Sequence, residues 1–173
     1  MTEPRQQDRF VSLIDEHRKI LFKVAGSYAR QPADREDLIQ EMALQMWRSF
    51  DRYDETQRFS TWMYRVALNV AISFYRRQTR RSRVLVSDEN AIELAPTPGG
   101  HETYEELATL RRLIEGLNDF DRALVILYID GNSYAEIASV LGISESNVGT
   151  KLNRIKQQLR SDYAGKEKRH GTR

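Results

Sequence analysis

The sequence predicts an all-α protein made of two small helical domains joined by a flexible linker, and three observations support this. Apolar residues recur at steps of three and four along most of the chain, the period of a helix buried on one face. Residues 82–101 lose that period and carry two prolines and two adjacent glycines. No segment alternates polar and apolar residues as a strand would. We expect a first domain at 8–81, a linker at 82–102, a second domain at 103–161 and a polar tail at 162–173.

The first domain is predicted to contain three helices. The first spans about residues 10–28 and ends before the break at Gln31-Pro32-Ala33. The second begins at Asp34, which has the side chain of an N-cap and is followed by acids that the helix dipole favours. A polar loop at 51–55 separates it from a third helix at about 60–81.

The linker is acidic and lies between two basic stretches. Residues 65–83 contain six arginines and residues 146–160 contain four bases, in both cases without an acid. Residues 84–110 contain six acids and no lysine or arginine. Fully extended, about 20 residues reach roughly 65 Å, about two turns of duplex DNA. The charge of the linker suits either a mimic of nucleic acid or a solvated tether.

Residues 133–144, Ser-Tyr-Ala-Glu-Ile-Ala-Ser-Val-Leu-Gly-Ile-Ser, are the most specific stretch of the sequence. They predict a helix at about 134–141, a turn at Gly142 where a positive φ is easy, and Ser144 as the cap of a helix at 145–160. Ala138 is small enough for two helices to approach closely. This is the pattern of a helix-turn-helix, whose second helix enters the major groove. A helical hairpin with a solvated basic face is the alternative.

The predicted DNA-binding residues of this motif share the polar face of its second helix. Amide and basic side chains there can donate to base edges or phosphates, and a glycine lets the backbone approach DNA. The candidates are Ser144, Ser146, Asn147, Gly149, Thr150, Lys151 and Arg154.

The composition argues against several other classes of protein. The chain has no cysteine, which excludes disulfides and thiolate metal sites, and its three histidines are far apart. No nucleophile–base pair or phosphate-binding glycine loop is present, so we expect no enzyme, no cofactor and no metal. The acids between Asp34 and Glu41 are an alternative Mg²⁺ site, but on one helix turn they more often complement the dipole. No apolar run approaches a membrane span, so we expect a cytoplasmic protein without membrane insertion.

Two motifs, in the expected order, resemble the extracytoplasmic-function (ECF) subfamily of sigma-70-type RNA polymerase sigma factors. The first is Asp-Arg-Glu-Asp-Leu-Ile-Gln-Glu at 34–41, followed by Trp47, by Phe-Ser-Thr-Trp-Met-Tyr-Arg-Val-Ala-Leu-Asn at 59–69 and by the arginine cluster. The second is the helix-turn-helix, and the resemblance covers about residues 8–81 and 103–161. It implies a factor that binds core RNA polymerase, recognises promoter DNA and promotes its opening without catalysing a reaction.

The resemblance also assigns roles to residues. It implies that the face formed by Asp37, Leu38, Gln40 and Glu41 binds the polymerase. It implies that Asn69, Ser73, Arg76, Arg77 and Arg80 bind the minus-ten element and that the helix-turn-helix binds the minus-thirty-five element. Trp62 and Tyr64 are alternative wedges for strand opening, although the helical spacing places Trp62 in the core. Gly149 replaces a basic residue common in the family and Ser73 an asparagine of some members, which leaves the promoter sequence open.

The partners expected from this resemblance are core RNA polymerase, promoter DNA and an inhibitory anti-sigma factor, for which the sequence shows no binding motif. A second hypothesis is an ordinary regulator that binds duplex DNA alone, as a dimer. The motif at residues 34–41 argues against it, since such a regulator needs no polymerase-binding face. The alternative interpretation of that same motif is a capped and solvated helix face without a binding role.

Overall fold

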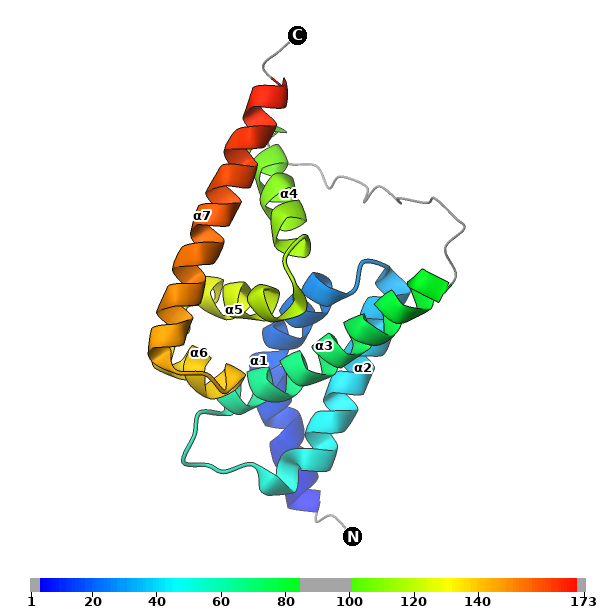
Figure 1. Cartoon of the computed structure of the whole chain (residues 1–173). Coiled ribbons are helices and arrows are strands. Elements are labelled where there is room, and N and C mark those ends of the chain that lie inside the picture. The colour runs from blue at the N-terminus through cyan, green and yellow to red at the C-terminus, as the bar shows by residue number, and fades with distance from the viewer. Residues whose placement is uncertain (1–3, 85–100, 171–173) are drawn as a thin grey trace.

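The computed structural model describes residues 4–84 and 101–170, and every regular element in these ranges is helical (Figure 1). The elements are α1 (Pro4–Tyr28), α2 (Pro32–Ser49), the 3-10 turn η1 (Phe50–Arg52), α3 (Phe59–Val84), α4 (His101–Glu115), α5 (Asp119–Ile129), α6 (Tyr134–Leu141) and α7 (Glu145–His170). The all-α prediction is confirmed. Most of the predicted linker, residues 85–100, lies outside the described residues.

The N-terminal unit, residues 4–84, is a bundle of α1, α2 and α3. Its core holds fully buried side chains from all three helices, including Val24, Met42 and Met63. Trp62 is 6% exposed and packs against Phe50 and Phe59 in an aromatic cluster at one end of the bundle. The expectation that Trp62 belongs to the core is confirmed. Tyr64 is also buried, so neither ring lies on the surface as a wedge.

Two predicted boundaries in this unit are wrong by a few residues. Helix α2 begins at Pro32 with Gln31 as its N-cap, so Asp34 lies inside the first turn and does not cap the helix. The fixed φ of proline suits the first helical position. Proline lacks a backbone N–H, which costs nothing there because the first N–H groups of a helix have no partner within the helix. Part of the predicted polar loop at 51–55 continues α2 as the 3-10 turn η1.

The C-terminal unit, residues 101–170, contains the predicted helix-turn-helix in α6 and α7. Helix α6 begins with a capping box in which the Ser133 hydroxyl accepts from the Glu136 backbone N–H and the Glu136 carboxylate accepts from the Ser133 N–H. Gly142 ends α6 at a φ of 68°, and Ser144 caps α7 by accepting from the Asn147 N–H at 3.2 Å. Helix α7 continues to His170, past the predicted end at 160 and through most of the predicted polar tail.

The two units pack against each other. Helix α3 lies against both α5 and α6, so the basic helix of the first unit faces the second unit (Figure 1). Arg122 of α5 is 2% exposed at this junction, between the rings of Tyr28 and Tyr75 at 5.2 and 4.7 Å from its guanidinium carbon. It donates to the carbonyl oxygens of Ser27, Glu115 and Leu117.

Candidate nucleic-acid and polymerase interfaces

The first candidate interface is the polar face of α7. Val148, Leu152 and Ile155 are buried against the rest of the C-terminal unit, as the helical spacing predicts. The opposite face is largely exposed, with Lys151 and Gly149 only partly so. Two of its hydroxyls are engaged locally, since Thr150 donates to the Ser146 carbonyl and Ser144 caps the helix. The exposed amide of Asn147 is therefore well placed to reach DNA from this face.

Arg154 is held by an acid from a different helix. Its guanidinium donates to the Asp121 carboxylate at 3.0 Å, and the Lys151 ammonium lies 4.0 Å from the other oxygen of Asp121. Asp121 is 4% exposed and also accepts from the Asn118 side chain at 2.8 Å. Lys151 lies over the ring of Phe120 as well. The carboxylate thus holds Arg154 by a charge-assisted hydrogen bond, attracts Lys151, and partly offsets the charge of both cations on α7.

Gly149 does not open a free path to the backbone of α7. A Cβ atom built at this position would lie 3.4 Å from the ring of Tyr134, which packs beside the glycine from the start of α6. Tyr134 is itself partly exposed, so its phenol belongs to the same surface as the recognition helix. Gly149 is predicted from the sequence to let DNA approach the backbone closely, and the Tyr134 ring occupies part of that space.

The second candidate interface is a stripe along α3. Asn69, Ser73, Arg76 and Arg80 follow one another at steps of four, three and four residues, and all are exposed. The Ser73 hydroxyl donates to the Asn69 carbonyl, and the Arg76 guanidinium pairs with Asp119 of α5 at 2.5 Å. The stripe predicted from sequence is therefore a continuous surface, with Arg76 engaged by the C-terminal unit.

Arg77 points away from this stripe. Its guanidinium donates to both carboxylate oxygens of Glu41 on α2, each at 2.8 Å. This pair joins one residue predicted to bind the minus-ten element to one predicted to bind polymerase. Both side chains are about half exposed, so the pair is an exchangeable surface contact.

The third candidate interface is the outer face of α2. Asp37 and Gln40 are exposed and Glu41 is partly exposed, as a docking face requires. Leu38 is fully buried in the bundle core, so its predicted place in that face is wrong. The apolar member of the face is Leu44, which is 48% exposed and lies seven residues after Asp37 and three after Glu41. That spacing was visible in the sequence, but nothing there distinguishes an exposed leucine from a buried one.

Two titratable side chains, Glu136 at the start of α6 and Tyr28 at the end of α1, have shifted pKa values. The backbone N–H of Ser133, then its hydroxyl and then Arg58, lower the pKa of Glu136, so this carboxylate is ionised in the capping box. At the junction between the units, burial raises the pKa of Tyr28, and its protonated phenol donates to the Asp119 carbonyl at 2.6 Å.

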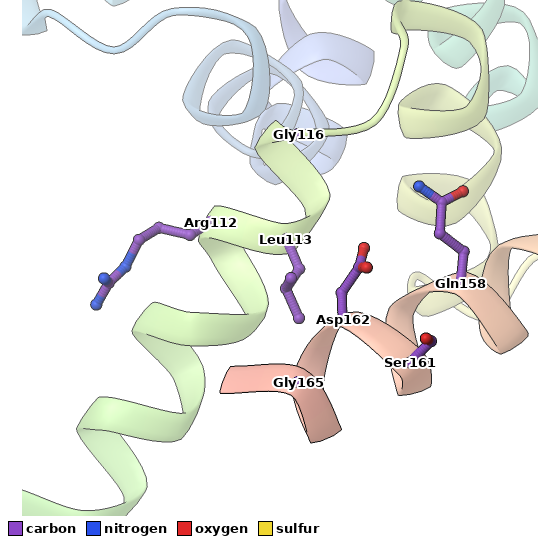
Figure 2. Close-up of a pocket in the computed structure, with 7 residues that line it drawn as sticks. All are labelled: Arg112, Leu113, Gly116, Gln158, Ser161, Asp162 and Gly165. Atoms are coloured by element: carbon purple, nitrogen blue, oxygen red, sulfur yellow. The ribbon is translucent and has the colours of Figure 1, made fainter. Parts of the chain in front are cut away.

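A hollow of about 430 Å³ separates α4 from α7 near its C-terminal end. Figure 2 shows Leu113 and Asp162 reaching into it while Arg112 extends outward. The side chains that line it do not converge on a point as a catalytic site requires. Within residues 4–84 and 101–170, no three histidine or acidic side chains are arranged to hold a metal ion. No helix in these ranges has the length and apolar character needed to cross a bilayer.

Comparison with known proteins agrees with this arrangement. Residues 13–81 match the sequence model of sigma-70 region 2, and residues 107–159 match that of sigma-70 region 4. The ECF RNA polymerase sigma factor SigE of Mycolicibacterium smegmatis is 30% identical over 159 residues, which are 89% of this chain and 61% of that protein. This chain thus spans less than two thirds of the length of that relative.

Two further matches cover most of this chain and most of the protein that it is compared with. The ECF RNA polymerase sigma-E factor of Salmonella typhimurium is 30% identical over 152 residues, 79% of this chain and 78% of that protein. The co-crystal structure of the sigma factor RpoE with the anti-sigma factor NepR from Bartonella quintana has the same fold, with a TM-score of 0.64, 20% identity and coverage of 90% of this chain and 94% of that one. With both sigma-70 regions present in this order, the chain belongs to the extracytoplasmic-function subfamily of sigma-70-type RNA polymerase sigma factors, which initiate transcription.

Proposed function

We propose that three helices of this sigma factor each bind a different part of the transcription machinery or the promoter. The outer face of α2, with Asp37, Gln40, Glu41 and Leu44, docks on core RNA polymerase. The stripe on α3 binds the opened minus-ten element, and the polar face of α7 binds the minus-thirty-five element as duplex. The domain of residues 8–81 thereby binds polymerase and the opened strand, and the domain of residues 103–161 binds the duplex.

The stripe on α3 is the observation that carries this proposal. An exposed amide and hydroxyl, Asn69 and Ser73, precede two exposed arginines on one helical face, which suits polar contact with an unstacked base and ionic contact with its backbone. Duplex readers use a helix in the major groove, and α7 already offers one. The stripe has no obvious use in a regulator that binds only duplex DNA.

The remaining assignments rest on family membership. We infer that the chain catalyses no reaction, since sigma factors act on the polymerase and the promoter without turnover of a substrate. It acts where the polymerase acts, in the cytoplasm. The Bartonella relative is held with an anti-sigma factor, and we infer an anti-sigma partner for this chain too.

Run-off transcription with core polymerase and a promoter library tests the proposal. We expect promoter-specific transcripts from the chain together with core polymerase, and weak duplex binding by the chain alone. Tight sequence-specific binding without polymerase, with no transcripts, would assign the chain to the ordinary regulators.

The docking face is tested with Asp37→Lys and Leu44→Asp in a binding assay with core polymerase. We expect each substitution to weaken core association about tenfold or more, because a desolvated contact loses an apolar group or meets a reversed charge. Association is measured by fluorescence titration of core polymerase. Val11→Asp on α1 is the matched control for Leu44→Asp, since Val11 is also an exposed apolar side chain. If Leu44→Asp and the control Val11→Asp associate equally well with core polymerase, α2 is not the docking site.

A further inference from the structure

A second cavity lies at the junction between the two units. Its volume is about 450 Å³, which is in the range of small-molecule sites. The end of α1 and the start of α2 line one side of it, and α3 contributes Tyr75, Gln78 and Thr79. The C-terminal unit contributes Glu115 and Arg122. A molecule that fills this cavity therefore contacts both units.

Arg122 is a buried cation without a carboxylate partner. It is 2% exposed, and within residues 4–84 and 101–170 no carboxylate lies at ion-pair distance from its guanidinium. Its Nη1 and Nη2 atoms donate to three backbone carbonyls, which stabilise the charge without neutralising it. Buried charges in proteins are as a rule paired with an opposite charge. A bound anion would supply that charge.

One hydrogen-bond donor of this guanidinium also lacks a partner. The Nε–H of Arg122 is buried and has no acceptor among the residues that the structure describes. Because the guanidinium is planar, this N–H lies on the same edge as Nη2, which donates to the Glu115 carbonyl at 2.5 Å. Glu115 and Arg122 both line the cavity, so this edge is on the cavity side. The free donor suits one oxygen of a carboxylate, which also carries the charge that the arginine lacks.

The α1–α2 side of the cavity has the opposite electrical character. Asp34 lines it, is partly exposed, and forms no ion pair within the described ranges. Helix α1 ends beside the cavity at Tyr28, and the unsatisfied carbonyls at the end of a helix carry partial negative charge. Both features favour a cationic group such as an ammonium.

The balance of charge favours a zwitterion over a plain anion. Arg30 and Glu115, the other charged residues of the cavity, pair with each other at 3.5 Å. One cation, Arg122, and one carboxylate, Asp34, are left for a ligand. A molecule with one carboxylate and one ammonium group satisfies both, whereas a divalent phosphate would bring two negative charges to a single arginine.

We propose that the junction cavity binds a small zwitterion of the amino-acid type. Its carboxylate accepts from the Nε–H of Arg122, and its ammonium group lies towards Asp34 and the end of α1. Its carbon skeleton lies against the rings of Tyr28 and Tyr75. A ligand that contacts both units stabilises the folded chain in proportion to the logarithm of its concentration. The proposal is independent of the roles proposed for α2, α3 and α7.

Ligand binding by the full chain is measured first by thermal melting and then by calorimetric titration. The probes are the common L-α-amino acids, β-alanine and γ-aminobutyrate, which differ in the spacing between their two charges. At about 5 mM we expect at least one of them to raise Tm by about 2–4 °C, with a Kd of about 1 mM or below. For each binder, the analogue without the ammonium group and the analogue without the carboxylate should bind about tenfold more weakly.

Substitutions at the two charged groups test the orientation of the ligand. Asp34→Asn should weaken binding of the zwitterion about tenfold and leave binding of the analogue without an ammonium group unchanged. Glu36→Gln is the matched control, because Glu36 is exposed on the same helix and does not line the cavity. Arg122→Lys removes the Nε–H and should weaken binding of both molecules. Circular dichroism checks its fold, and Asp34→Asn tests the proposal by itself if Arg122→Lys unfolds.

Three results would overturn the proposal. The first is a set of probes in which none raises Tm. The second is equal affinity of Asp34→Asn and Glu36→Gln for the zwitterion. The third is binding of inorganic phosphate, or of the analogue without an ammonium group, as tight as that of the zwitterion, which would make the cavity a plain anion site.

Discussion

At the scale of single residues, the recognition helix depends on a carboxylate that it does not carry. Asp121 of α5 is almost fully buried and still ionically paired, with Arg154 and Lys151 on its two oxygens. Buried charges persist only when they are paired and hydrogen-bonded, and Asn118 completes the set of partners. A buried acid thereby orients two cations on the face of α7 that we propose to bind the minus-thirty-five element.

Asp121→Asn tests this positioning role. We expect the two cations to become more mobile and to lose their carboxylate partner, so that their contacts with phosphates strengthen and their contacts with particular bases weaken. Discrimination by the holoenzyme between a selected minus-thirty-five element and an altered one should fall by about 1 kcal/mol, roughly fivefold. The slope of the logarithm of duplex affinity against that of salt should steepen by about 1. Asp162→Asn removes the same charge from α7 and should change neither quantity, and unchanged discrimination in Asp121→Asn would contradict the role.

At the scale of elements, caps and turns explain where the helices of the second unit begin and end. Asn118, Ser133 and Ser144 accept from backbone N–H groups at the starts of α5, α6 and α7, and Gly142 supplies the left-handed residue between the last two. These signals are local, which is why the predicted bounds of α6 agree with the structure. The end of α7 was misplaced because its last residues are polar, and a polar helix lacks the apolar period on which the prediction relied.

Gly149 lies inside α7, where it neither begins nor ends the helix. Glycine inside a helix costs about 1 kcal/mol relative to alanine, and the neighbouring Tyr134 ring leaves ordinary contact distance for a methyl group. We expect Gly149→Ala to raise the free energy of unfolding by about 0.5–1 kcal/mol, measured by urea denaturation.

Gly26→Ala in α1 is the control, since a Cβ there meets nothing within 4 Å. It should stabilise by a similar amount. Stabilisation by Gly26→Ala together with destabilisation by Gly149→Ala would mean that Tyr134 cannot move aside, and that glycine is required at this position for packing.

At the scale of the whole molecule, a buried arginine helps to join the two units. Arg122 belongs to α5, yet it donates to Ser27 of the N-terminal unit and to two carbonyls of its own unit, and it lies between Tyr28 and Tyr75. The ion pairs around it are exposed, so Arg122 and the rings make up the less exchangeable part of the interface.

Arg122→Lys keeps the charge and removes the planar group that reaches three carbonyls. We expect the free energy of unfolding to fall by about 1–3 kcal/mol, because a single ammonium leaves buried carbonyls without donors. Urea denaturation followed by circular dichroism measures it. The control Arg160→Lys, on the exposed face of α7, should change the free energy of unfolding by no more than about 0.5 kcal/mol. A similarly small change in Arg122→Lys would contradict the role of Arg122 in joining the two units.

The sequence by itself determined the all-α class, the order of the helices, the helix-turn-helix and the family, because each of these follows from period, cap and motif within a short stretch of chain. Only the tertiary structure decided which candidate residues are free to bind. Leu38 is buried while Leu44 is exposed, and Arg76 and Arg154 are engaged by Asp119 and Asp121. Those acids lie 43 and 33 residues away along the chain from their arginines. An ion pair between distant residues depends on how helices pack, and no local pattern records that.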